Sequence, residues 1–226
     1  MATYVVRVWV PDRPGALGAV ASRIGAVKGD LVGIDILERG GGRAIDELTV
    51  DLPDPALLPL LVSEVTEVDG VDVEDVRPAP EWLADPRLDA LEAAAVLVDQ
   101  DRTGDLLERL VSHAVRDFNA DWAAVVDLES PEPVTSLGPV PAAAWLAAFV
   151  AGSRMSAVPG GVFNGPEDVA WAEMANPQLA LVLGRRGRPF RARERLQLAA
   201  LSRIANHRWT ELAVRASRLD HPSTAR

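Results

Sequence analysis

The chain has 226 residues, of which 48% are hydrophobic and 25% are charged, and its formal net charge is −10. This length predicts two domains, and the composition is typical of a soluble globular protein. The negative charge argues against non-specific nucleic-acid binding by the whole chain, and the absence of cysteine excludes thiol nucleophiles, cysteine-ligated zinc and iron–sulfur clusters.

The N-terminal segment carries an apolar run that Arg7 interrupts and Pro11 ends, without a basic leader. We therefore expect a cytoplasmic protein. The longest mostly apolar stretch, Val140 to Gly152, is shorter than the roughly 20 residues that cross a bilayer. No membrane span is expected.

Residues 3–10 alternate in polarity and are rich in β-branched side chains, which predicts a strand. From Ala16 onward the apolar positions recur at helical spacing, which predicts a helix. Lys28 and Gly29 supply a basic last turn and a C-cap for this helix.

An alternating pattern returns in residues 31–39 and 44–52, on either side of a run of three glycines, and predicts a β-hairpin. A second helix opens at Pro55 or Pro59, and residues 71–76 form a short last strand. The order βαββαβ is that of a ferredoxin-like fold, in which two helices cover one face of an antiparallel sheet.

Residues 8–37, VWVPDRPGALGAVASRIGAVKGDLVGIDIL, resemble the opening of an ACT domain, the small-molecule-sensing module of amino-acid metabolism. The family pattern is a strand, an acid, a basic or variable residue, Pro-Gly-x-Leu, a helix, and then glycine with Asn or Asp before the next strand. The matching residues are Asp12, Arg13, Pro14, Gly15, Leu17, Gly29 and Asp30. The resemblance covers about the first third of the chain.

The chemistry of this loop follows from its residues. Pro11 and Pro14 restrict the backbone, and Gly15 leaves no side chain to block another molecule. Amide N–H groups at the start of a helix have no intrahelical acceptor and lie at the positive end of its dipole, so a carboxylate fits there. The resemblance implies that this loop binds an amino acid, usually at an interface with a second copy. The predicted ligand-binding residues are Asp12, Arg13, Pro14, Gly15, Ala16, Leu17 and Asp30.

Two observations keep another interpretation open. Pro-Gly between a strand and a helix is often only a tight turn, and Asp12 can serve as a helix cap. Asp30 stands where many amino-acid-binding ACT domains have Asn. As a carboxylate it accepts hydrogen bonds only, so it favours an ammonium group and repels a carboxylate.

Beyond a short linker the pattern predicts two helices, at residues 88–98 and 104–118, before a strand at residues 121–128. SPEP at residues 130–133 predicts a turn, and an alanine-rich helix follows near residues 141–150.

The C-terminal part is partly ambiguous. Glycine and proline clusters at residues 159–166 predict loops, and residues 168–174 fit neither a helix nor a strand clearly. An apolar run predicts a buried strand at residues 178–184. A long amphipathic helix is expected from residue 192 to residue 219.

Residues 179–209, LALVLGRRGRPFRARERLQLAALSRIANHRW, are similar to the closing strand, turn and helix of GAF domains, which are small sensor modules related to PAS domains. GAF domains bind cyclic nucleotides, other small ligands or chromophores, or only dimerise, and nothing in this sequence selects among these. The arginine-rich last helix lacks interleaved aromatic residues and a preceding helix-turn-helix, so we expect no nucleic-acid binding.

Several other residue types are interpreted as structural. Asp46 and Glu47 are neighbours on opposite faces of a strand and make a poor catalytic pair. No histidine has metal-ligand spacing or a recognisable nucleophile beside it; the histidines are His113, His207 and His221. Three tryptophans could line a pocket, but aromatic residues in such segments more often belong to the core; they are Trp122, Trp145 and Trp171.

The expected fold class is α+β: a ferredoxin-like ACT domain at residues 1–79, a linker at 80–87, a GAF-like domain with a long C-terminal helix at 88–219, and a tail at 220–226. We predict a non-enzymatic regulatory homodimer that senses an amino acid or similar small ligand, without metal or cofactor, and signals through an unidentified protein partner. The alternatives are a ligand-free dimerisation or interaction module and a GAF-based nucleotide sensor.

Overall fold

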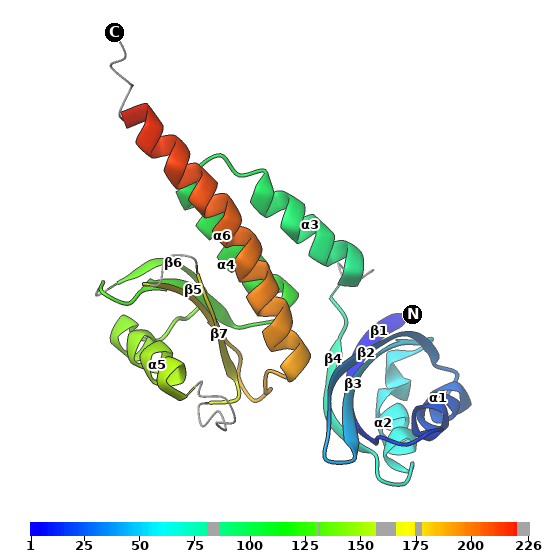
Figure 1. Cartoon of the computed structure of the whole chain (residues 1–226). Coiled ribbons are helices and arrows are strands. Elements are labelled where there is room, and N and C mark those ends of the chain that lie inside the picture. The colour runs from blue at the N-terminus through cyan, green and yellow to red at the C-terminus, as the bar shows by residue number, and fades with distance from the viewer. Residues whose placement is uncertain (81–85, 131, 157–165, 175–177, 221–226) are drawn as a thin grey trace. The chain divides into compact units, whose positions relative to one another are not determined.

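The computed structural model describes residues 1–80, 86–130, 132–156, 166–174 and 178–220 (Figure 1). The chain forms two compact units, one of residues 1–84 with 191–193, the other of residues 85–190 with 194–226. Most of the predicted linker, the loops predicted at residues 159–165 and nearly all of the predicted tail lie outside the described residues. Among the described helices, none combines the length and the apolar character needed to span a membrane.

The N-terminal unit has the predicted βαββαβ order. Its elements are β1 (Ala2–Pro11), α1 (Ala16–Ala26), β2 (Asp30–Gly40), β3 (Arg43–Leu52), the short 3-10 helix η1 (Pro55–Leu57), α2 (Leu58–Thr66) and β4 (Asp72–Pro78). The sheet order is β2-β3-β1-β4, and every neighbouring pair is antiparallel. This topology is ferredoxin-like and confirms the predicted fold of the first third of the chain.

One face of this sheet forms the hydrophobic core of the unit, and α1 and α2 cover that face (Figure 1). Strand alternation decides which side chains face the helices, because residues directly opposite each other in a pair share a face. Val6 is opposite Leu48 and Val8 is opposite Asp46. The buried core consists of Val6, Val8, Val10, Ala16, Val20, Ile24, Val27, Leu48, Val50, Leu52, Leu61, Val65 and Val71.

Helix α1 ends differently from the prediction. The left-handed residue after the helix is Lys28, with φ 62°, and not Gly29. The N–H of Gly29 donates to the carbonyl of Ile24 and that of Lys28 to the carbonyl of Gly25, at 3.0 Å each, which is a Schellman motif. Gly29 is needed for close packing, because a Cβ there would lie 3.0 Å from Ile24 Cγ2.

The C-terminal unit contains α3 (Pro86–Val98), α4 (Thr103–Asp117), β5 (Trp122–Asp127), β6 (Pro133–Leu137), α5 (Ala143–Ser156), β7 (Val169–Glu173), β8 (Leu179–Gly184) and α6 (Ala192–Asp220). The sheet order is β6-β5-β8-β7, again antiparallel. The prediction missed β6. This edge strand begins with proline and is mostly exposed, so it shows no apolar alternation. The ambiguous segment proves to contain β7.

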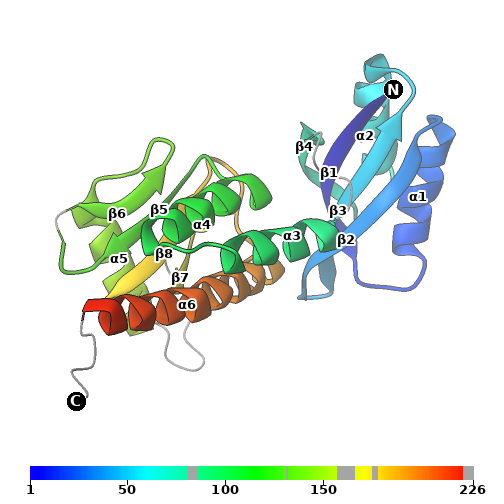
Figure 2. The ribbon, with the colours of Figure 1, turned by 90° about the horizontal axis from the view of Figure 1, so that it is seen from above.

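Three layers form this unit (Figure 2). Alternate residues of β5 point to opposite faces: Ala123 and Val125 pack with α3, α4 and α6, whereas Ala124 and Val126 pack with α5. Because both faces of the central strands are covered, β5 and β8 read as continuous apolar runs in the sequence.

A buried arginine joins the turn after β8 to the rest of the unit. Arg185 is 3% exposed, and its two terminal nitrogens contact the Glu194 carboxylate at 2.8 Å each. The guanidinium also donates to the carbonyls of Phe118, Arg188 and Pro189. The charge of Arg185 is therefore fully compensated inside the protein.

We expect Arg185→Leu to destabilise the C-terminal unit by about 3–5 kcal/mol, because it removes the guanidinium that both oxygens of the buried Glu194 carboxylate contact. Arg186→Leu is the matched control, since the neighbouring side chain is exposed. Urea denaturation followed by circular dichroism measures both. Equal midpoints for the two variants would contradict a stabilising role for Arg185.

Candidate functional site

The predicted ligand loop lies at one end of the N-terminal sheet. It connects the end of β1 at Pro11 to the start of α1 at Ala16. Pro11 pairs with Arg43, and Arg43 pairs with Gly40, so the β2–β3 turn lies at the same end. The turn that leads from α2 into β4 is also there, since β4 runs antiparallel to β1.

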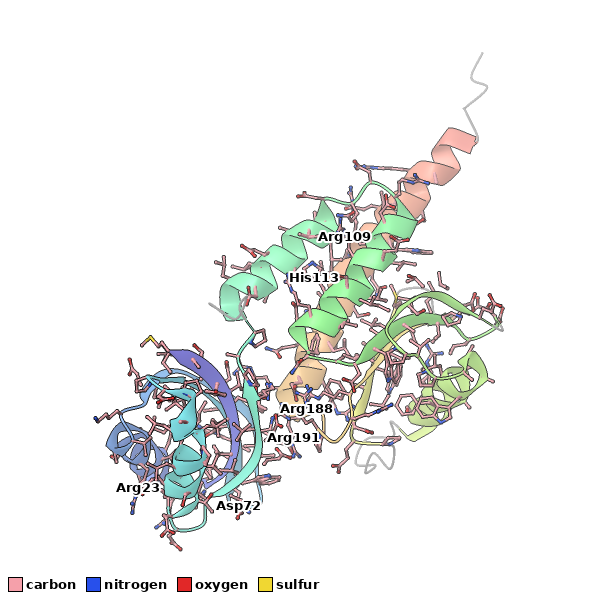
Figure 3. The ribbon with its side chains drawn as sticks, turned by 180° about the vertical axis from the view of Figure 1, so that it is seen from behind. Arg23, Asp72, Arg109, His113, Arg188 and Arg191 are labelled. Atoms are coloured by element: carbon pink, nitrogen blue, oxygen red, sulfur yellow. The ribbon has the colours of Figure 1, made fainter. Side chains whose placement is uncertain are left out.

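Short-range contacts hold these three turns together. The N–H of Asp12 donates to the carbonyl of Gly42 at 2.9 Å. The guanidinium of Arg13 donates to Asp69 at 3.2 Å. Arg43 donates to Asp72 at 2.5 Å, and Figure 3 labels Asp72 at this end of β4. The backbone of Asp12 and the side chain of Arg13 thus contact the neighbouring turns at this end of the sheet.

Gly15 precedes the first residue of α1 in a left-handed conformation, with φ 87° and ψ −16°. A side chain is strained at this φ, which explains the glycine. No atom lies within 4 Å of the position that a Cβ would occupy. Apart from the two neighbouring residues of the chain, the protein therefore leaves the space beside the Gly15 Cα open.

The start of α1 has no side-chain cap. Among the described residues no side chain accepts a hydrogen bond from its first turn, and that turn contains no acidic residue. Within the described residues, the N–H groups of Leu17 and Gly18 have no acceptor, and Ala16 makes only a long contact of 3.3 Å to the carbonyl of Arg13. The alternative in which Asp12 caps the helix is therefore wrong. The uncapped amides remain at the positive end of α1.

Asp30, the last predicted ligand residue, lies at the opposite end of the sheet. It pairs with Asp51, which pairs with Thr3 at the beginning of β1. β1 has 10 residues, and a strand rises about 3.3 Å per residue, so its two ends are roughly 30 Å apart. A single chain therefore does not bring Asp30 to the loop that contains Gly15.

Sequence reasoning missed one residue near the loop. Asp46 lies in β3 on the face that α1 and α2 cover, opposite Val8 and Ile36. It is 3% exposed, and its Oδ1 has no hydrogen-bond partner among the described residues. The signal was present in the sequence: Asp46 continues the inward-facing series of Leu48 and Val50, which makes it an acid at a core position.

The environments of Asp46 and Glu47 differ because they lie on opposite faces, as predicted. Burial raises the pKa of Asp46 above its ordinary value; Arg39 opposes this rise and Asp12 adds to it. Burial also acts against the ionised form of Glu47, but Arg77 and Arg7 outweigh it and lower the pKa of Glu47. Glu47 accepts hydrogen bonds from both arginines, at 2.8 Å and 2.7 Å.

The histidines form no catalytic or metal-binding group in the described part of the chain. His113 lies on α4 (Figure 3) and is buried, with its Nδ1 3.3 Å from the Asp117 carboxylate and 3.2 Å from the Arg116 guanidinium. His207 is exposed on α6. His221 lies outside the described residues. Across the described ranges, no cluster of three or more histidine and acidic side chains is positioned to hold a metal ion.

The three tryptophans are distributed over the core and the surface of the C-terminal unit. Trp122 is buried in the cluster beneath α5, and Trp171 packs against the same cluster. Trp145 is 42% exposed and stacks on Phe149 at 5.4 Å between ring centroids. Trp122 and Trp171 therefore have the structural role that was expected of them.

No protein-family model matches this sequence, and no curated protein matches it. Solved structures similar to the chain include the ACT domain of a GTP pyrophosphokinase from Chlorobium tepidum, at 17% identity over 34% of this chain and 97% of that one, with a TM-score of 0.28. A free methionine-R-sulfoxide reductase from Neisseria meningitidis matches 61% of this chain and 95% of its own, at 16% identity and a TM-score of 0.40. An unknown protein from Galdieria sulphuraria matches 97% and 92% of the two chains, at 12% identity and a TM-score of 0.34.

We expect Asp46→Asn to stabilise the protein at pH 7 by about 1 kcal/mol, because the amide removes an unpaired buried charge. The raised pKa of Asp46 means that the folded state binds the proton more tightly than the unfolded state does. The stability cost of Asp46 therefore grows as the pH rises above 3.8 and disappears below it. Denaturant unfolding of both proteins between about pH 3 and pH 7 measures this; a pH-independent difference would contradict it.

Proposed function

We propose that the protein is a non-enzymatic regulatory sensor whose N-terminal unit binds an amino acid or a similar small ligand at residues 12–17. The observation that supports this most is the uncapped start of α1, where the amides of Leu17 and Gly18 have no acceptor in the described structure. Side chains, water or ligands satisfy such amides in helices, and a ligand carboxylate would supply an acceptor here. Open space at Gly15 gives the ligand access to these amides.

The edge of the sheet supports the homodimer that the resemblance to ACT domains implies. β2 is an edge strand, and it exposes Val32 and Ile34 by 52% and 45%. An apolar edge with unpaired backbone groups is suited to pairing with another strand. A second copy of the chain, joined through its own β2, would cover both features.

This arrangement also provides a role for Asp30. If two copies of β2 pair antiparallel about a two-fold axis centred on residue 35, the middle of the strand, residue 30 of one strand lies opposite residue 40 of the other. Gly40 is at the loop end of the sheet, because the β2–β3 turn lies beside Asp12. Asp30 of a second copy would therefore approach the loop, although Asp30 of the same chain does not.

The C-terminal unit is proposed to be the GAF-like part of the sensor, which passes the ligand signal to a protein partner.

One observation favours the second candidate function, a ligand-free interaction module. Helix α3 exposes Leu88, Leu91 and Val98 by 52%, 69% and 50%. Residues 91 and 98 are two helical turns apart and share a face, as residues 88 and 91 do. Apolar residues gathered in this way are suited to contact another protein.

A thermal-shift screen of the proteinogenic L-amino acids tests the ligand site. A ligand at 100 times its dissociation constant should stabilise the protein by about 2.7 kcal/mol. We expect Gly18→Leu to abolish the shift, since it places a side chain on the first turn of α1, where nothing lies within 4 Å. Gly25→Leu, in the same helix and equally open, should retain it.

Both glycine substitutions should leave the ligand-free protein at least as stable, because leucine favours a helix over glycine by up to about 1 kcal/mol. Loss of stability in Gly18→Leu would show that the variant does not report on binding. If no amino acid shifts the wild-type protein, the ligand-free interaction module becomes the better explanation.

The dimer is tested by size-exclusion chromatography with light scattering. We expect a dimer for the wild-type protein and a monomer for Ile34→Glu, because a charge on the edge strand opposes strand pairing. Leu60→Glu on α2 is the matched control, since Leu60 is 48% exposed and Ile34 is 45% exposed. A wild-type monomer at micromolar concentration, or dissociation in both variants, would contradict an interface at β2.

A further inference from the structure

We propose that Asp46 is the buried anionic anchor of the ligand site and that its carboxylate binds the ammonium group of a zwitterionic ligand whose carboxylate occupies the amides of Leu17 and Gly18. This inference rests on the proposed function and names the ligand class, a small molecule that carries both an ammonium group and a carboxylate. It assigns to Asp46 the electrostatic role that the sequence alone gave to Asp30.

The register places Asp46 under the loop end of α1. Val8, the β1 residue opposite Asp46, is three residues before Pro11, where the loop begins. At about 3.3 Å per residue, the backbone of Asp46 lies roughly 10 Å from that end of the sheet. The side chain is on the face that α1 covers, since Val8 belongs to the core beneath α1 and α2.

The side chains that flank Asp46 across the sheet are apolar, and the residues between Asp46 and the loop have small side chains. Val8 and Ile36 flank it across the sheet and offer no polar group. The next inward position of β3 toward the loop is Ala44, which has the smallest side chain of that face. Ala16, the first residue of α1, is also small and is 7% exposed.

No group of the described structure neutralises this carboxylate by direct contact. Oδ1 of Asp46 has no hydrogen-bond partner, and no ion pair joins Asp46 to any described cation. Arg39 and Asp12 act on Asp46 electrostatically with opposite signs. An unpaired buried carboxylate is costly, and an ammonium group is the partner that would make it favourable.

The contrast with the other face of the sheet makes the unpaired state of Asp46 informative. Glu47, the next residue of the same strand, accepts hydrogen bonds from Arg7 and Arg77. The neighbouring acid of the same strand is therefore paired within the protein, whereas Oδ1 of Asp46 has no partner among the described residues. The positive end of α1 and the negative charge of Asp46 thus supply opposite charges toward the loop end of the unit, and an amino acid carries the two complementary charges.

Matched pairs of small molecules test this inference on the full-length protein. Each L-amino acid that shifts the melting temperature is compared by calorimetry with the L-α-hydroxy acid of the same side chain, which keeps the carboxylate and replaces the ammonium group with a hydroxyl. The wild-type protein should bind the amino acid at least about tenfold more tightly. Asp46→Asn should bind the two equally, at about the affinity of the hydroxy acid.

Asp51→Asn is the control, because Asp51 lies in the same strand at the other end of the sheet, where it accepts a hydrogen bond from Thr3 at 2.5 Å. It should preserve the tenfold preference. The role of Asp46 would be overturned, and the proposed function left intact, if Asp46→Asn still preferred the amino acid over the hydroxy acid by the wild-type factor. Circular dichroism must show that this variant is folded. If neither amino acids nor hydroxy acids bind the wild-type protein, both proposals fail. Binding of hydroxy acids as tight as that of amino acids in the wild-type protein overturns this inference alone.

Discussion

The structure of the N-terminal unit depends on one constraint: the apolar face of its sheet must be covered by helices. Val6 and Val8 in β1, with Leu48 in β3, place apolar side chains on one face, and α1 and α2 must lie there to remove that surface from water. The chain consequently turns from β1 into α1 within a few residues of Pro11. That turn exposes the amides of the helix start, and the same covering buries Asp46.

Two of the buried charged side chains, Arg185 and Asp46, illustrate different roles of a desolvated group. Arg185 contacts Glu194 and several carbonyls, so its burial joins the β8–α6 turn to the core of the C-terminal unit. Asp46 is equally hidden but lacks a hydrogen-bond partner at Oδ1 within the described structure. The hydrogen bonds of Arg185 account for its burial. The burial of Asp46 is unfavourable unless a partner from outside the described structure binds its carboxylate.

The length of the strands separates the predicted site residues, so that the proposed self-association would have a functional role. The loop at Gly15 and the residue Asp30 lie at opposite ends of the same sheet, because α1 returns the chain antiparallel to β1 before β2 begins. An ACT-like site that used both would need two chains. In such a sensor, ligand binding and dimer geometry would be coupled, since the ligand would favour the arrangement in which both copies contribute.

Local pattern determined most of the elements, because strand alternation, helical spacing and turn residues such as Pro11 and Gly15 act over a few positions. The sequence did not reveal β6, which is an exposed edge strand without apolar alternation. It also suggested Gly29 where the structure uses Lys28 as the left-handed residue. Only the tertiary structure decided that Asp46 is buried without a partner at Oδ1 and that Asp30 is distant from the loop. Strand register and the packing of helices on the sheet set these two facts, and both depend on residues far apart in the chain.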